Sequence, residues 1–267
     1  ITKMNYSLET GITVTRLAVV LVALLALAYG RGNQEGLSLY GNTSDTSVNN
    51  LGRMPSCTHQ QALDLRKSGQ ELVLNWSVDT AYYSYIKRFR NDQPVKGTTE
   101  QQMVYASAVS KSMLQRPVNS FKQLFESKRI KYEKGAELLV NAVQNMTYFK
   151  VEPGECHSTN SDPCIGGIPF GLLYPVETIV LFGGDCDSKT LLLYCLLKQI
   201  GYDVAIVGSS KANHVLLGIA NIPLTGFSIE QGNKKYYLWE TSEAGWIPGD
   251  IPKKLRAYDD LKIIYNN

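Results

Sequence analysis

Cys186 stands where a thiol could act as a nucleophile, in the stretch GGDCDSKTLLLYCLLKQIGYDV at 183–204. Two glycines permit a tight turn, and Asp185 is a favourable N-cap whose carboxylate can accept the amides of Asp187 or Ser188. Cys186 would then open a helix, where unpaired amides and the helix dipole favour thiolate over thiol. The alternative is a small buried thiol that happens to follow two glycines.

The helical phase predicts how much of the Cys186 side chain is enclosed. It puts the cysteine on the inward stripe and turns Asp187 and Lys189 away from it. The other members of this stripe are Thr190, Leu193 and Leu197. The sulfur should therefore lie at the rim of the core, half inside a cleft.

A thiolate nucleophile needs a base that can also protonate a leaving group, and histidine is the usual choice. The chain has three histidines. His59 and His157 lie in polar segments and are expected to be solvated, whereas His214 opens the apolar run HVLLGIANI. Glu240 ends the next run, KKYYLWE, and a hairpin pairing of the two runs would bring it near His214. Alternatively, His214 is a hydrogen-bonded histidine at a sheet edge and Glu240 a solvated strand-end carboxylate.

Other thiol and cofactor chemistries find less support. Cys195 lies nine residues beyond Cys186, about 13 Å along the helix and on the opposite face, so it cannot resolve a redox pair and is expected in the core. Neither C-x-x-C nor H-x-x-x-H occurs, and nucleotide-binding glycine motifs are absent. The sequence thus predicts no metal site and no cofactor.

The elements that must position these residues form an α+β pattern. A strand is predicted at ELVLNWSVD, followed by helices at about 99–114, 120–126 and 133–145. The cysteine helix comes next, and two strands follow it. Strands after one buried helix favour an α+β core over a doubly wound sheet.

The order of three motifs resembles the transglutaminase-like superfamily of papain-fold cysteine enzymes, bacterial or archaeal type. These motifs are GGDCDSK, then NHV, then YYLWET with GWIPGDIP after it. The segments YPVET, GYDV and VQNMTY also look similar, so the resemblance covers about 104–251. It implies a fold in which the helix bearing the cysteine packs on a small antiparallel sheet, preceded by a helical subdomain.

The resemblance also implies a mechanism. Cys186 would attack a carboxamide or peptide carbonyl, His214 would act as base and acid, and Glu240 would orient the imidazole. Many members carry aspartate at the third position, so Glu240 must reach one methylene further. Backbone amides at the helix start, including that of Cys186, would hold the oxyanion with one further unidentified donor. Release to water gives a protease or amidase, and release to a lysine amine gives a crosslink.

The N-terminal segment predicts attachment to a membrane. Residues 17–29 are apolar or small and span only about 20 Å as a helix, against a hydrocarbon core of roughly 30 Å. A helix that begins near Gly11, with Arg16 extended toward the interface, reaches a plausible span. The alternatives are a signal-peptide hydrophobic region or an assembly helix. We therefore predict a hydrophobic helix at 1–30, a Gly/Ser/Asn-rich tether at 31–56 and a transglutaminase-like domain at 57–267.

Partners and location follow from charge and cysteine usage. The 27 basic and 24 acidic residues form no basic stripe, so nucleic acid is not expected to bind. A protein or peptide substrate is expected, with residues 12–30 contacting a membrane or a larger assembly. A thin positive-inside bias and the sequons at Asn42, Asn75 and Asn145 favour an extracytoplasmic domain, although a sequon at Asn5 lies on the other side. The pair Cys156 and Cys164 in a polar loop favours the same side if the two form a disulfide, and the alternative is two free surface thiols. The alternative function is a non-catalytic structural subunit of a membrane complex or filament that retains the fold.

Overall fold

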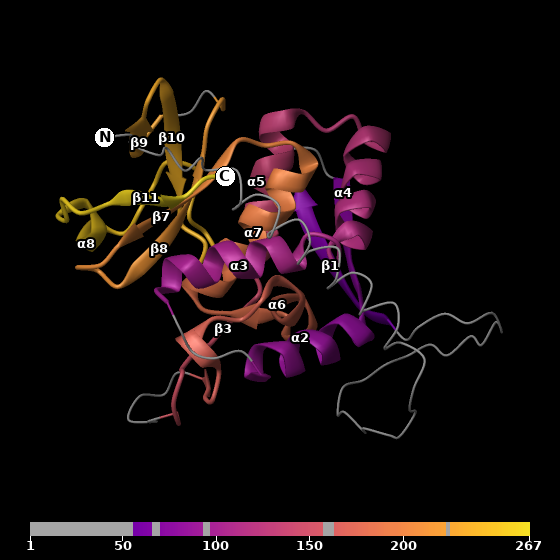
Figure 1. Ribbon diagram of the computed structural model, residues 1–267. Coiled ribbons are helices and arrows are strands. Elements are labelled where there is room, and N and C mark those ends of the chain that lie inside the picture. Colours follow the sequence, from indigo (N-terminus) through magenta and orange to yellow (C-terminus); the bar gives the residue numbers. More distant parts are fainter. Residues whose placement is uncertain (1–55, 66–69, 93–96, 157–162, 223–224) are drawn as a thin grey trace, which may run out of the picture. The chain divides into compact units, whose positions relative to one another are not determined.

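One long helix, α7 (Cys186–Ile200), lies between a sheet and a group of helices (Figure 1). The structure is a computed structural model, and it describes residues 56–65, 70–92, 97–156, 163–222 and 225–267. Every residue from 188 to 197 is buried, so α7 is enclosed on all its faces. A helix that is apolar on nearly every side requires such a position in the core.

The sheet beside α7 has five strands, all paired antiparallel, in the order β11-β7-β8-β10-β9. The strands are β7 (Val204–Ser209), β8 (His214–Ile219), β9 (Ser228–Gln231), β10 (Lys234–Trp239) and β11 (Lys262–Tyr265). β7 and β8 form the centre of the sheet and contact α7.

The two faces of this sheet have different neighbours, as the alternation of side chains along a strand requires. One face packs into the main core around α7 with Ile206, Leu217 and Trp239. The other face carries Val207, Leu216 and Leu238, which form a second cluster with residues near the short helix α8 (Lys253–Arg256).

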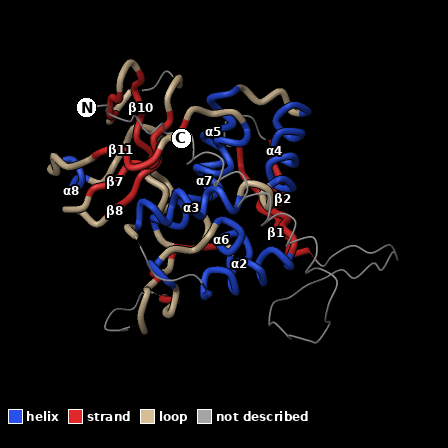
Figure 2. Tube along the Cα trace, in the orientation of Figure 1, coloured by secondary structure: helices blue, strands red, loops and turns tan. Residues whose placement is uncertain are grey.

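The remaining elements cover the other side of α7 (Figure 2). Strands β1 (Ser56–Leu65) and β2 (Gln70–Asp79) pair antiparallel along their whole length and contact several of the helices. The helices are α2 (Thr80–Asp92), α3 (Thr99–Ser110), α4 (Gln115–Ser127), α5 (Tyr132–Gln144) and α6 (Pro175–Leu181). A short 3₁₀ turn at Pro169–Gly171 precedes α6.

Two short parallel pairs connect the helices with the start of α7. β3 (Thr147–Tyr148) pairs with β6 (Gly183–Gly184), and β4 (Lys150–Val151) pairs with β5 (Cys164–Ile165). The segment that follows α5 therefore lies beside the two glycines that precede the cysteine helix.

These observations confirm the predicted α+β class and the packing of the cysteine helix on a small antiparallel sheet. The predicted helices correspond to α3, α4 and α5, and the predicted strands to β2, β8 and β10. Helices α2, α6 and α8, strands β1, β7, β9 and β11, and the short strands β3 to β6 were not predicted from the sequence.

The predicted hydrophobic helix at 1–30 lies outside the described residues. So does the tether at 31–56, apart from Ser56, which begins β1. Among the helices that the structure describes, none combines the length and apolarity needed to cross a membrane.

Candidate active site

The start of α7 presents Cys186 as predicted. Asp185 is the N-cap in an extended conformation, and its Oδ1 accepts a 3.0 Å hydrogen bond from the amide of Ser188. Cys186 is the first helical residue, and its side chain is half-buried. The cap therefore fixes where the helix begins and where the thiol lies.

The glycines before the cysteine are needed for close packing. A Cβ at Gly183 would collide with the carbonyl oxygen of Thr147 in the paired strand β3. A Cβ at Gly184 would lie 2.9 Å from the Cβ of Ser188. A larger residue at Gly183 would therefore push the segment after α5 away from the start of the cysteine helix, and one at Gly184 would crowd the first turn of that helix.

The surroundings of the thiol contradict one prediction. Burial raises the pKa of Cys186 well above its ordinary range, and the charges of Asp187 and Asp185 add to this effect. The thiol also lies 3.5 Å from Oδ1 of Asp187, to which it donates. The pKa of Cys186 is therefore raised and not lowered as expected, because burial and the charges of two carboxylates outweigh the effect of the helix start.

His214 and Glu240 lie together on paired strands as predicted, but the two strands do not form a hairpin, because β9 stands between them in the sequence. Strands β8 and β10 pair antiparallel with Leu217 opposite Trp239, and the Nε2 of His214 is 2.8 Å from Oε2 of Glu240. The other carboxylate oxygen of Glu240 accepts the amides of Thr241 and Ser242, each at 2.9 Å. Glu240 is 1% exposed and has both oxygens occupied, so its orientation is fixed.

His214 and Glu240 shift each other's pKa. Burial lowers the pKa of His214, but the hydrogen bond and charge of Glu240, with the charge of Asp187, raise it overall. Burial raises the pKa of Glu240, but the hydrogen bond and charge of His214, with the bonds from Ser242, lower it overall. The pair favours an imidazolium beside a carboxylate.

Cys186 lies near the start of strand β8, which carries His214. The backbone amide of Val215, the residue after His214, interacts with the thiol and lowers its pKa. Asp187 interacts with both the thiol and the charge of His214. Since Nε2 of His214 is engaged by Glu240, Nδ1 is the nitrogen left to exchange a proton with another group.

Two residues of the same helix behave differently from their predicted orientation. Asp187 was expected to point away from Cys186, but it contacts the thiol. Lys189 was also expected to point outward, but its side chain is completely buried and donates to backbone carbonyls. Helical phase could not reveal the contacts of Lys189, because its carbonyl partners lie in segments distant in the sequence, whereas Asp187 contacts the thiol of the residue next to it.

The other cysteines and histidines lie elsewhere. Cys195 is buried in the core as predicted, and burial raises its pKa to about 12. His59 is half-buried rather than solvated, because it packs on Phe182 and bonds to the carbonyl of Val180. His157 lies outside the described residues.

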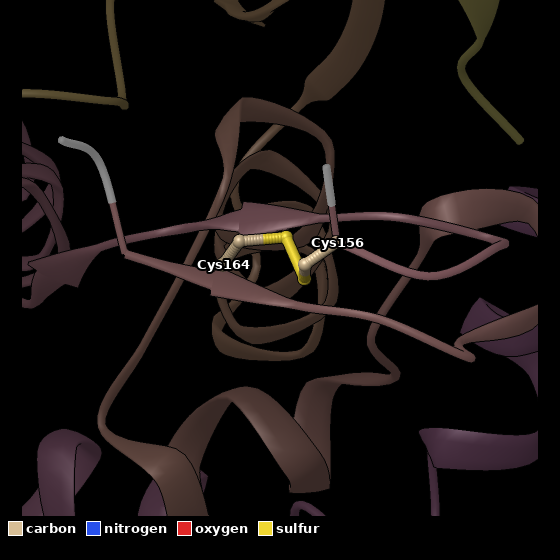
Figure 3. Close-up of a disulfide and its surroundings, with 2 residues drawn as sticks. All are labelled: Cys156 and Cys164. Atoms are coloured by element: carbon tan, nitrogen blue, oxygen red, sulfur yellow. A yellow bond between two sulfur atoms is a disulfide. The ribbon is translucent and has the colours of Figure 1, made fainter. Parts of the chain in front are cut away.

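The predicted disulfide is present. Cys156 and Cys164 are bonded, with their Cα atoms 6.0 Å apart (Figure 3). Of the sequons, Asn75 and Asn145 are exposed, whereas Asn5 and Asn42 lie outside the described residues.

Comparison with known proteins gives few matches. No family model matches this chain, and no curated protein does either. Among solved structures, a chain of Legionella pneumophila LapG is 17% identical, with 69% of this chain and 82% of LapG covered and a TM-score of 0.31. LapG from an EGTA-treated sample is also 17% identical, with 67% and 78% covered and a TM-score of 0.30. At these TM-scores we base no conclusion on the likeness.

Proposed function

We propose that this chain is a cysteine acyl-transfer enzyme that acts on protein or peptide amides through a thioester on Cys186. The observation that carries the proposal is the 2.8 Å bond between His214 and Glu240, whose other carboxylate oxygen is held by two backbone amides. The backbone of Val215, the next residue after His214, lowers the pKa of the Cys186 thiol. The resemblance of the three motifs to transglutaminase-like enzymes supports the same roles.

In the proposed reaction, the neutral form of His214, which is present above its raised pKa, takes the proton of the thiol on Nδ1 as the sulfur attacks the carbonyl carbon, and the ring thereby becomes an imidazolium. The raised pKa of Cys186 means that this proton moves during the reaction and not before it. Glu240 stabilises the imidazolium that forms. Backbone amides at the start of α7 hold the oxyanion, and His214 then protonates the departing amine. Water or a second amine finally releases the acyl group.

Activity assays on the full chain test this proposal. Cleavage of a fluorescent protein substrate and incorporation of a fluorescent amine distinguish hydrolysis from transamidation. Cys186→Ala should abolish activity, whereas Cys57→Ala, which changes a half-buried thiol on β1, should retain it. A Cys186→Ala protein with wild-type activity in both assays would overturn the proposal.

The raised pKa of Cys186 also favours a second candidate function, a non-catalytic structural subunit of a membrane complex or filament. A resting thiol that no base activates would be inert. This candidate predicts that a thiol-reactive probe labels Cys186 no faster than Cys57 and that the native protein is oligomeric in mild detergent. A labelled, active monomer would exclude it.

We further propose that residues 12–30 tether the domain to a membrane, with the domain on the extracytoplasmic side. The apolar segment at 17–29 and the Cys156–Cys164 disulfide support this location, because disulfides persist mainly in oxidising compartments. Resistance of the full chain to alkaline extraction, lost when residues 1–30 are deleted, is the expected result. Extraction of the full chain into the soluble fraction would contradict it.

A further inference from the structure

We propose that Lys189 is a positioning residue that fixes the Glu240 loop, residues 240–242, against the cysteine helix and thereby aligns Glu240 with His214. The catalytic meaning of this inference rests on the proposed function. The positional part concerns only the side chains and can be tested without any substrate.

Lys189 makes three hydrogen bonds from a completely buried position. Its Nζ lies 2.8 Å from the carbonyl oxygen of Met146, 2.8 Å from that of Ser242 and 3.4 Å from that of Gln144. The side chain is 0% exposed, so these carbonyls replace water as its acceptors. An ammonium has three donors, and each is engaged.

The three carbonyls belong to the two segments that flank the candidate site. Ser242 is the residue whose amide donates to Oε1 of Glu240, so Lys189 holds the peptide that holds the carboxylate. Met146 immediately precedes β3, which pairs with the glycines before Cys186. A single ammonium on α7 therefore joins the cysteine side of the site to the carboxylate side.

Neighbouring contacts complete this attachment. Oγ1 of Thr190 lies 2.8 Å from Oγ1 of Thr241, and Nε2 of Gln144 donates to the carbonyl of Glu240 at 2.7 Å. These groups are neutral, and Lys189 is the charged member of the set. The Glu240 loop is thus fastened at three consecutive residues, to α5 through Gln144 and to α7 through Thr190 and Lys189.

Burying a charged ammonium costs free energy, so the presence of Lys189 in the core calls for an explanation. Burial lowers its pKa to about 8, and Glu240, Glu243 and Asp185 oppose this by attracting the cation. An apolar side chain would avoid the cost of burial, but it would leave the carbonyls unpaired. A cation here also keeps the nearby Glu240 ionised, which the imidazolium of His214 requires.

The test follows the protonation of His214 by nuclear magnetic resonance in the full chain, where only three histidines have to be assigned. The variants are Lys189→Met and, as a matched control, Lys198→Met, which changes an exposed lysine on the same helix. In Lys189→Met the pKa of His214 should fall toward its ordinary 6.5, because Glu240 is no longer held in place. Lys198→Met should titrate like the wild type.

The direction of the shift separates positioning from a purely electrostatic effect. Removal of a nearby positive charge alone would raise the pKa of His214, since it would ease protonation. An unchanged or raised pKa in folded Lys189→Met would therefore overturn the inference. If Lys189→Met does not fold, Lys189→Gln supplies neutral N–H donors on a shorter side chain. The same fall in the pKa of His214 is expected in this variant. An unchanged or raised pKa of His214 would again overturn the inference.

Failure of the proposed function has a different signature. If Cys186→Ala retains full activity, the proposed enzyme is wrong, yet the titration of His214 still decides whether Lys189 positions Glu240. If Cys186 is essential and the Lys189 variants leave the titration of His214 unchanged, the enzyme stands and the positioning role fails.

Discussion

At the scale of single residues, the central feature is a histidine whose partner has no freedom to move. Glu240 uses one oxygen for His214 and the other for two backbone amides. A carboxylate bound in this way stabilises the charged imidazole. The extra methylene of glutamate, relative to aspartate, does not prevent this contact.

Glu240→Gln should remove the carboxylate that holds the pKa of His214 up. Because the pKa of His214 is raised in the folded protein, its pairing stabilises the fold below pH 6.5, and this contribution is lost as the pH rises through the folded value. The variant should lose this stability at acidic pH and lose activity by roughly a hundredfold. Denaturant unfolding at several pH values measures the first effect. Glu243→Gln, at an exposed site, should show neither effect, and an unaltered pH dependence in Glu240→Gln would contradict the assignment.

Replacement of the Asp187 carboxylate should make the thiol of Cys186 easier to ionise. Its charge and its hydrogen bond with Cys186 both raise the pKa of the thiol. Asp187→Asn should therefore ionise Cys186 at a lower pH, which ultraviolet absorbance of the thiolate measures. Asp259→Asn, at a surface carboxylate paired with Lys211, should leave the thiol unchanged. A Cys186 that ionises at the same or a higher pH in Asp187→Asn would refute this assignment.

At the scale of elements, the boundaries of α7 connect sequence to site. Asp185 begins the helix and Gly201, at φ +119°, ends it in the left-handed region. Both residues are typical of their positions, so the helix could be predicted from the sequence.

The N-cap also predicts a pH dependence. Burial and the charge of Asp187 raise the pKa of Asp185 from 3.8 to about 6, although Ser188 opposes this. The folded state therefore holds this proton more tightly than the unfolded state, and stability should fall as the pH rises from about 4 to 6. Asp185→Asn keeps a capping side chain and should lose that slope, as thermal unfolding across this range would show. A slope equal to that of the wild type would contradict the assignment.

Some elements could not be predicted because local pattern and tertiary context disagree. The β1 segment SCTHQQALDL is polar and irregular, and it becomes a strand because β2 pairs with it residue by residue. Helix α2 contains several aromatic residues with modest helix propensity, and packing against α6 supports it. Lys189 is charged and was therefore expected at the surface. It is buried instead, and this could not be predicted because its three carbonyl partners lie in segments distant in the sequence.

At the scale of the whole molecule, the grouping of the candidate site residues could be predicted from the sequence, whereas their pKa values could not. The order of Cys186, His214 and Glu240 along the chain, with antiparallel pairing expected for the strands of the last two, was sufficient to predict that they lie together. The raised pKa of the thiol was not predictable, because it depends on how deeply folding buries the sulfur.

The disulfide is a further whole-molecule feature that the sequence indicated. It links Cys156 to Cys164, which are eight positions apart, next to the paired strands β4 and β5 (Figure 3). Replacing both cysteines with serine should cost about 2 to 3 kcal/mol of unfolding free energy, since the unfolded loop is no longer closed. Urea unfolding measures this loss, and an unchanged midpoint would refute it. The titration of His214 should stay the same, because neither cysteine contacts the site.

The proposal that His214 accepts the proton of Cys186 is tested most directly by the pH dependence of the alkylation rate of Cys186 in the wild type and in His214→Gln. If the imidazole accepts the thiol proton, wild-type Cys186 should react near neutral pH despite its raised pKa, and His214→Gln should slow it by roughly a hundredfold. Identical rates in the two proteins across the pH range would mean that His214 and Cys186 do not share a proton, and the proposed enzyme would be wrong.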